Sequence, residues 1–276
     1  MTTRFLRVLE DSARRLHREL KIALTRDVRE AQWIFIVGCY NSGTELLLKL
    51  LGSHPAISSL PTEGHFLADD LPKDFVLGVP RMWMLREDLF RLTEKDPGPD
   101  PVRLRREWLM RLDRRKRVFV EKTPSSTPRT RWLQRHFENA HFIALVRDGY
   151  AVSEGIRRKA EPRHLMGGWP IELCARQWTR SYEILFEDEP HLERVMWLRY
   201  EDLTEDPSGE LGKLASFLGV PAQGFQPDGK WAIHERKESI RNLNAESVAR
   251  LTVEDLEAIT REAGAMLKRF GYPLRP

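Results

Sequence analysis

The chain has 276 residues, of which 41% are hydrophobic, and this length suffices for one α/β domain with a buried sheet. The net charge of +4 is modest, and Lys and Arg gather only in runs that would face water on helices, so we expect no nucleic-acid partner. The sequence has neither the roughly 20 consecutive apolar residues of a membrane span nor a signal-peptide pattern, and we expect a cytoplasmic protein without a transmembrane anchor.

The first predicted element is an amphipathic helix over about residues 4–21. Apolar residues recur there at helical spacing on one stripe, and arginines lie on the opposite side. A solvated charged face explains this pattern better than membrane-surface or partner binding, because charge runs on helices usually face water.

A pattern of strand, loop and helix then recurs four times. The first strand is predicted at residues 33–37, and the leucine-rich helix that follows ends near Gly52. Three further strands are predicted at 118–120, 141–146 and 195–198, with helices over about 129–137, 150–159 and 208–218. Strands that alternate with helices indicate a parallel sheet covered on both faces, so we predict a three-layer α/β fold.

Two other regions complete the predicted organisation. Residues 71–117 are charged and interrupted by prolines, and we interpret them as a helical insertion. Residues 253–270 form a predicted helix that ends at Gly271. Because no internal repeat or low-complexity tract occurs, we predict a single domain over residues 1–276.

The loop from Gly38 to Thr44 has the glycine spacing of a phosphate-binding loop. Glycines let backbone N–H groups turn toward an anion, and the next helix presents its positive N-terminus. In triphosphatases a Lys precedes the Ser or Thr of this loop, whereas Thr44 here follows Gly43 directly. The missing Lys favours a phosphosulfate over a triphosphate; a tight turn without a ligand is the alternative.

No metal site is expected from the metal-ligating residue types. The only cysteines are Cys39 and Cys174, and the eight histidines are scattered along the chain. This composition argues against a zinc cluster and a disulfide framework, and it indicates a reducing compartment.

Three segments resemble the sulfotransferases that use 3′-phosphoadenosine 5′-phosphosulfate (PAPS). Residues 36–47 look like the 5′-phosphosulfate loop of that family, and residues 142–151 look like its 3′-phosphate motif. Residues 200–203 with 217–219 match its third segment, so the resemblance covers about residues 33–272. It implies a core like that of P-loop nucleoside triphosphate hydrolases, with PAPS as donor and 3′-phosphoadenosine 5′-phosphate (PAP) as product.

Within this superfamily the pattern is most similar to the tyrosylprotein sulfotransferase branch. The likeness rests on residues 146–149, Glu63, residues 122–124, residues 240–244 and residues 270–273. That branch acts in the secretory lumen behind a membrane anchor, which we do not expect here. The resemblance therefore transfers the fold and the donor more directly than the acceptor.

The same resemblance implies roles for particular side chains. Glu63 matches the catalytic base, with His65 as a nearby substitute, and Lys122 matches the cation at the departing oxygen. Arg147 and Lys159 match cations on the 3′-phosphate. The remaining donor residues are expected in the loop, at the nucleotide and in a closing flap: Asn41, Ser42, Gly43, Thr44, Glu45, Leu46, Tyr200, Ser239, Asn244 and Arg250.

Three positions depart from the family pattern. Asn41 replaces a cation, Glu45 replaces a Thr, and Gly155 replaces a Ser that binds phosphate. Glu45 would repel the donor unless it turned away or paired with Lys49 four residues on, and Ser153 could compensate for Gly155 only poorly. We interpret these departures as those of a divergent, active subfamily.

Two other functions stay open: a PAP-binding module without catalysis, and a nucleotide kinase of related core. The acceptor is a small molecule, a peptide or a glycan. Arg81, Arg86 and the basic residues of 103–117 would suit an acidic acceptor, although they could equally face solvent. The sequence also leaves open whether the chain forms a homodimer.

Overall fold

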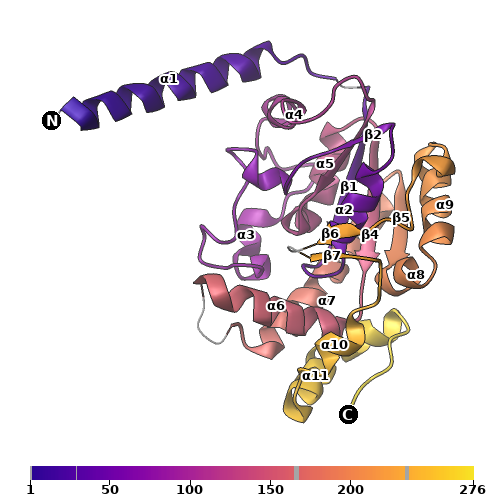
Figure 1. The fold of residues 1–276 in the computed structure, drawn as a ribbon. Helices are drawn as coiled ribbons and strands as arrows, with labels where there is room; N and C mark the ends of the chain where they lie inside the picture. The colour runs from indigo at the N-terminus through magenta and orange to yellow at the C-terminus, as the bar shows by residue number, and fades with distance from the viewer. Residues whose placement is uncertain (1, 29, 165–167, 234–235) are drawn as a thin grey trace.

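A computed structural model of the chain describes residues 2–28, 30–164, 168–233 and 236–276. Its centre is a five-stranded sheet with the order β2-β3-β1-β4-β5, in which every pairing is parallel (Figure 1). The strands are β1 (Gln32–Gly38), β2 (Ile57–Ser59), β3 (Val118–Lys122), β4 (Ala140–Val146) and β5 (Val195–Arg199). The predicted parallel sheet is thus confirmed, and the three-residue β2 adds an edge strand that was not predicted.

The sheet is buried on both faces because side chains alternate along each strand. In β1, Trp33 and Phe35 pack into one core, whereas Ile34 and Ile36 pack into the other. The second core is closed by α2 (Thr44–Gly52), α8 (Tyr200–Glu205) and α9 (Pro207–Leu218). The first is closed mainly by α5 (Thr130–His136), α6 (Gly149–His164), α7 (Ile171–Asp188) and α11 (Val253–Arg269). These layers confirm the three-layer α/β prediction; α7 was not predicted.

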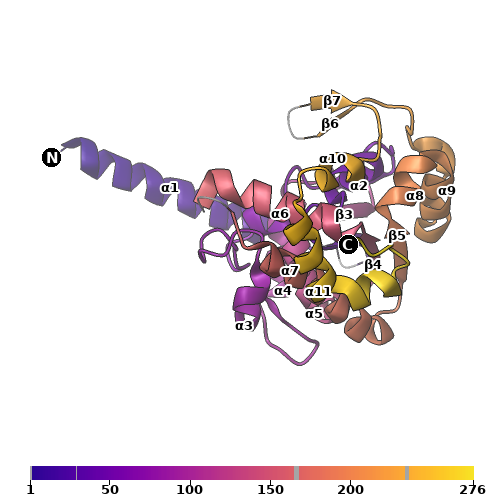
Figure 2. The same cartoon turned by 90° about the horizontal axis from the view of Figure 1, so that it is seen from below.

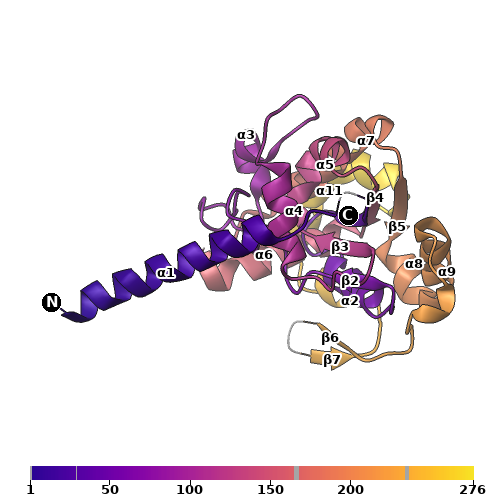
Figure 3. The same ribbon diagram turned by 90° about the horizontal axis from the view of Figure 1, so that it is seen from above.

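Helix α1 (Thr2–Leu24) includes the amphipathic helix expected over about residues 4–21, and it projects from the body in all three views (Figures 1, 2 and 3). Its C-terminal half is tied to α4 (Pro101–Leu109) by ion pairs, among them Arg103 with Glu19 at 2.8 Å and Arg18 with Glu107 at 3.0 Å. None of the helices in the described parts of the chain is long and apolar enough to cross a membrane.

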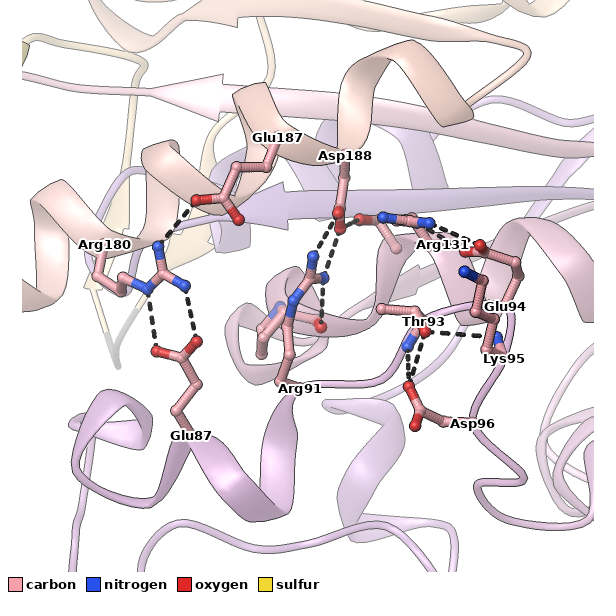
Figure 4. A network of polar contacts seen from close by, with 12 residues as sticks. Glu87, Arg91, Thr93, Glu94, Lys95, Asp96, Arg131, Arg180, Glu187 and Asp188 are labelled. Carbon is pink, nitrogen blue, oxygen red and sulfur yellow. Dashed lines mark hydrogen bonds and ion pairs between the residues drawn. The ribbon is translucent and has the colours of Figure 1, made fainter.

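The segment 71–117, expected as a helical insertion, contains short helical pieces joined by turns and loops. They are η2 (Trp83–Arg86), α3 (Glu87–Phe90) and α4. Ion pairs attach this segment to α5 and α7: Arg91 binds Asp188 at 2.6 Å, Arg131 binds Glu94, and Arg180 binds Glu87 (Figure 4). Residues 71–117 therefore pack onto the sheet domain.

Shorter elements surround the carboxyl ends of the strands. They are η1 (Gly64–Phe66), η3 (Pro124–Arg129), α10 (Asn244–Val248) and the antiparallel pair β6 (Trp231–Ile233) and β7 (Arg236–Glu238). The β6–β7 pair lies beside α2 (Figure 3), and α10 lies close to α6 (Figure 2). In an open parallel sheet, ligands bind at the carboxyl ends of the strands, which is where these elements meet.

Candidate active site

The loop between β1 and α2 makes close backbone contacts that only glycine permits. A Cβ on Gly38, whose φ is 138°, would lie 2.3 Å from the carbonyl oxygen of Leu145. A Cβ on Gly43, whose φ is 96°, would lie 2.5 Å from the ring of Tyr200. The loop is therefore fixed against β4 and α8. The first turn of α2 lines the adjoining cavity, so the positive end of the helix dipole faces that cavity.

This adjoining cavity, here called the donor cleft, has a volume of about 580 Å³. Seven Lys and Arg residues line it, against three Glu residues, so the described lining suits an anion. Thirteen of the sixteen predicted site residues line it: Asn41, Gly43, Thr44, Glu45, Leu46, Glu63, Lys122, Arg147, Gly155, Lys159, Tyr200, Ser239 and Arg250.

Three predicted residues do not line the donor cleft. The hydroxyl of Ser42 is buried 3.2 Å from that of Tyr182. Ser153, expected to compensate only poorly for the Ser missing at 155, has its buried hydroxyl donating to the carbonyl of Gly149 in the same helix. Asn244 contacts Arg147 instead of the cavity.

Arg147 follows β4 directly and is nearly buried. Its Nε donates to Oδ1 of Asn244 at 2.7 Å, and Nη1 donates to the carbonyl of Asn41 at 2.9 Å. The guanidinium lies 4.4 Å from the ring centroid of Tyr200, and Nη2 is buried without a hydrogen-bond partner among the described residues. Burial lowers the pKa of Arg147 because the charged form is desolvated. An anion in the cleft would satisfy this buried cation.

Glu63 and Lys122 form an ion pair at the wall of the cleft. Lys122, the last residue of β3, donates to Oε1 of Glu63 at 2.8 Å and lies 3.1 Å from Oε2 of Glu45. Burial alone lowers the pKa of Lys122, but the two carboxylates outweigh burial and raise it. Glu45 also lies 3.6 Å from Lys49, so the unexpected carboxylate in the loop is paired as its spacing predicted.

The backbone next to Glu63 is clamped from both sides. The N–H of Gly64 donates to Oγ1 of Thr123 at 2.8 Å and to Oε1 of Glu121 at 3.1 Å. The indole N–H of Trp108 donates to the carbonyl of Gly64 at 3.0 Å. Glu121 was not predicted; its carboxyl is fully buried, and burial raises its pKa to about 7. The available signal was a Glu directly after the predicted strand 118–120, next to Lys122.

A second cavity of about 240 Å³, here called the small cavity, shares Glu63, Arg81 and Lys159 with the donor cleft. Its other lining residues are Tyr40, His65, Phe66, Asp74, Phe75 and Pro80. His65 lies 3.6 Å from Glu63, and burial lowers the pKa of its imidazole to about 4. Because Glu63 borders both cavities, it can contact ligands held in either one.

Comparison with known proteins shows which family the chain belongs to. A model of the Sulfotransferase family matches residues 33–224. The chain is 25% identical over 204 residues to protein-tyrosine sulfotransferase 2 of Gallus gallus, covering 70% of this chain and 52% of that protein. It is also 25% identical over 169 residues to an omega-hydroxy-beta-dihydromenaquinone-9 sulfotransferase of Mycobacterium bovis, covering 58% of this chain and 42% of that protein. The chain thus spans about half the length of these curated relatives.

Solved structures show the same fold. The sulfotransferase domain of the Synechococcus PCC 7002 olefin synthase aligns with a TM-score of 0.55 and 22% identity, covering 91% of this chain and 98% of that domain. Sulfotransferase STF9 from Mycobacterium avium aligns with a TM-score of 0.56 and 16% identity, covering 97% of this chain and 86% of that protein. These likenesses confirm the expected fold, a core that resembles that of P-loop hydrolases.

Proposed function

The chain belongs to the sulfotransferase family, and we propose that it transfers a sulfuryl group from PAPS to a hydroxyl or amine of an acceptor and releases PAP. The observation that carries this proposal is the Glu63–Lys122 ion pair, 2.8 Å long, beside the cation-rich donor cleft. Glu63 also borders the small cavity, which would hold the acceptor. A base and a cation in contact between two such cavities suit transfer from a phosphate oxygen to a hydroxyl or amine.

In this proposal the donor cleft holds PAPS by its two charged ends. The N-terminus of α2 and its loop, including Thr44, would bind the phosphosulfate, because backbone N–H groups at a helix start favour anions. Arg147 and the ring of Tyr200 would bind at the 3′-phosphate and the nucleoside. The unsatisfied Nη2 of Arg147 supports this assignment, since a phosphate oxygen would accept from it.

The proposed reaction forms one bond and breaks one. The acceptor oxygen or nitrogen bonds to sulfur while the bond between sulfur and the bridging phosphate oxygen breaks. Glu63 takes the proton from the acceptor, and Lys122 donates a hydrogen bond to the departing oxygen as its charge grows. Lys122 would exchange its contact with Glu63 for one with the donor, which leaves the carboxylate available as a base.

The test is incubation with ³⁵S-labelled PAPS and a panel of phenols, alcohols, amines, peptides and glycans. We expect at least one acceptor class to be labelled, with the labelling lost in Glu63→Gln and Lys122→Ala. PAP binding without label transfer, and without release of PAP from PAPS, would identify a binding module. Phosphate transfer from ATP would instead identify a nucleotide kinase.

A cytoplasmic location is part of the same proposal. It is supported by Cys39 and Cys174, both buried and neither in a disulfide. Whether the chain pairs with a second copy is a separate question that sedimentation of the purified protein answers.

A further inference from the structure

We propose that Arg81 supplies positive charge that the phosphate-binding loop itself lacks. The 5′-phosphosulfate end of the donor would then be bound in part by residues 71–117, the segment that contains Arg81. This inference rests on the proposed function. The loop from Gly38 to Thr44 contains no Lys or Arg, although the phosphosulfate it would hold is anionic at both phosphorus and sulfur. Lys122 at the end of β3 is one cation that reaches this end of the donor from another part of the chain, and Arg81 is a second that lies beside Asn41.

Arg81 lies against this loop. Its Nη1 is 3.5 Å from Oδ1 of Asn41, and its guanidinium carbon is 5.9 Å from the ring centroid of Tyr40. Arg81 also lines both the donor cleft and the small cavity. The guanidinium is therefore positioned where the two cavities meet, beside the loop residue that lacks a charge.

Helix α6 comes close to the loop at Asn41. A Cβ added at Gly155 would lie 3.1 Å from both Cβ and Cγ of Asn41, which is tighter than most real Cβ contacts. The glycine at 155 therefore permits this close approach of α6 to the loop.

The backbone of Arg81 is held in an unusual conformation. Its φ of 60° is uncommon for a residue other than glycine, and such strain persists only where neighbouring contacts impose it. The N–H of Arg81 donates to Oδ2 of Asp74 at 2.7 Å, and the indole N–H of Trp169 donates to the carbonyl of Pro80 at 2.8 Å. These contacts hold the residue in place before any ligand binds, as a positioned binding group requires.

The cations gathered around Arg81 would favour a bound anion. Lys159 lines the same two cavities, and its pKa is lowered to about 7, first by burial and then by the charges of Arg81, Arg158 and Arg147. Glu154 opposes this shift only in part. Cations gathered in a partly buried place repel one another until an anion binds between them.

The experiment is calorimetric titration with two ligands, PAP and adenosine 3′-phosphate, which lacks the 5′-phosphate. We expect Arg81→Ala to weaken PAP binding roughly 10–100-fold and to leave adenosine 3′-phosphate binding unchanged. Arg81→Lys should restore part of the PAP affinity. Arg86→Ala is the matched control, because Arg86 lies in the same segment, its side chain is 41% exposed, and it pairs with Asp88 at 3.4 Å.

The outcomes separate this inference from the proposed function. Wild-type protein that binds no PAP contradicts the proposed function itself. If wild type binds PAP and folded Arg81→Ala binds it equally well, the role of Arg81 is wrong while the function stands. Equal weakening of both ligands also contradicts the inference, because it indicates a distorted cleft; Arg81→Gln repeats the test if the Ala variant does not fold. Unchanged PAP affinity with a raised KM for an acidic acceptor would assign Arg81 to the acceptor.

Discussion

The ammonium nitrogen of Lys122 lies 2.8 Å from a carboxylate oxygen of Glu63, although 58 residues separate the two along the chain. Lys122 ends a central strand, and Glu63 follows the edge strand β2 that pairs with it. The parallel pairing of β2 with β3 thus brings the proposed base to the proposed charge-stabilising group. The clamp on Gly64 by Glu121 and Trp108 fixes the backbone next to the carboxylate.

Glu63→Gln tests the assignment of the base. We expect PAP affinity near that of wild type and turnover lowered roughly 10²–10⁴-fold, because the amide cannot accept the acceptor proton. Calorimetry with PAP and steady-state rates with a labelled acceptor measure the two effects separately. Glu45→Gln is the control, since Glu45 contacts the same ammonium. Full activity in Glu63→Gln together with lost activity in Glu45→Gln would place the base on the loop.

Arg147→Ala tests the second anion site. We expect PAP affinity to fall roughly 10–100-fold in a folded protein, because charge-assisted hydrogen bonds to phosphate are lost. Adenosine 5′-phosphosulfate, which lacks the 3′-phosphate, should bind the variant and wild type alike. Arg194→Ala, at an exposed Arg paired with Glu193, is the control. Unchanged PAP affinity in Arg147→Ala would show that the 3′-phosphate binds elsewhere.

The half-buried ammonium of Lys159 predicts pH-dependent binding. Its pKa of about 7 in the free protein should rise when a phosphate anion binds, because the anion favours the charged form. PAP binding above pH 7 should then take up a proton, and affinity should fall by up to about tenfold per pH unit from pH 7 to 9. Titrations in buffers of different ionisation enthalpy measure this uptake. Proton uptake in wild type equal to that in Lys159→Arg would contradict the prediction.

Glu121 predicts a pH dependence of stability. Burial raises the pKa of its carboxyl from 4.5 to about 7, so the folded state keeps a proton that the unfolded state loses. The stabilisation is present below pH 4.5 and is lost as pH rises through about 7. Glu121→Gln, which keeps a carbonyl acceptor for Gly64, should lack this loss. Melting temperatures of the two proteins from pH 4.5 to 8 provide the test, and parallel curves would contradict it.

The sequence predicted the sheet from short local patterns, whereas most of the predicted residues that line the donor cleft came from the family resemblance. The strand before Gly38 and the strand before Arg147 are marked by runs of buried apolar residues, and their loops follow directly. Helix α7 escaped prediction because polar and charged residues interrupt its apolar stripe. Strand β2 has only three residues and carries little periodic signal.

The remaining site features depend on tertiary contacts. The hydroxyl of Ser153 donates to the carbonyl of Gly149 within α6, a contact that the family pattern does not reveal. From the sequence alone, Arg81 is a candidate only for an acidic acceptor, since its place beside Asn41 follows from how residues 71–117 pack on the domain. The buried pairing of Glu121 with Gly64 likewise joins residues 57 positions apart.

The most direct test of the central claim is calorimetric titration of the wild-type protein with PAP in EDTA, followed by titration with ATP and Mg²⁺. The loop lacks the Lys of triphosphatases, and Lys or Arg side chains from other elements line the cleft. We predict that PAP binds with micromolar or tighter affinity without metal and that ATP with Mg²⁺ binds far more weakly. Tight binding of ATP with Mg²⁺ and no binding of PAP would contradict the assignment of PAPS as the donor.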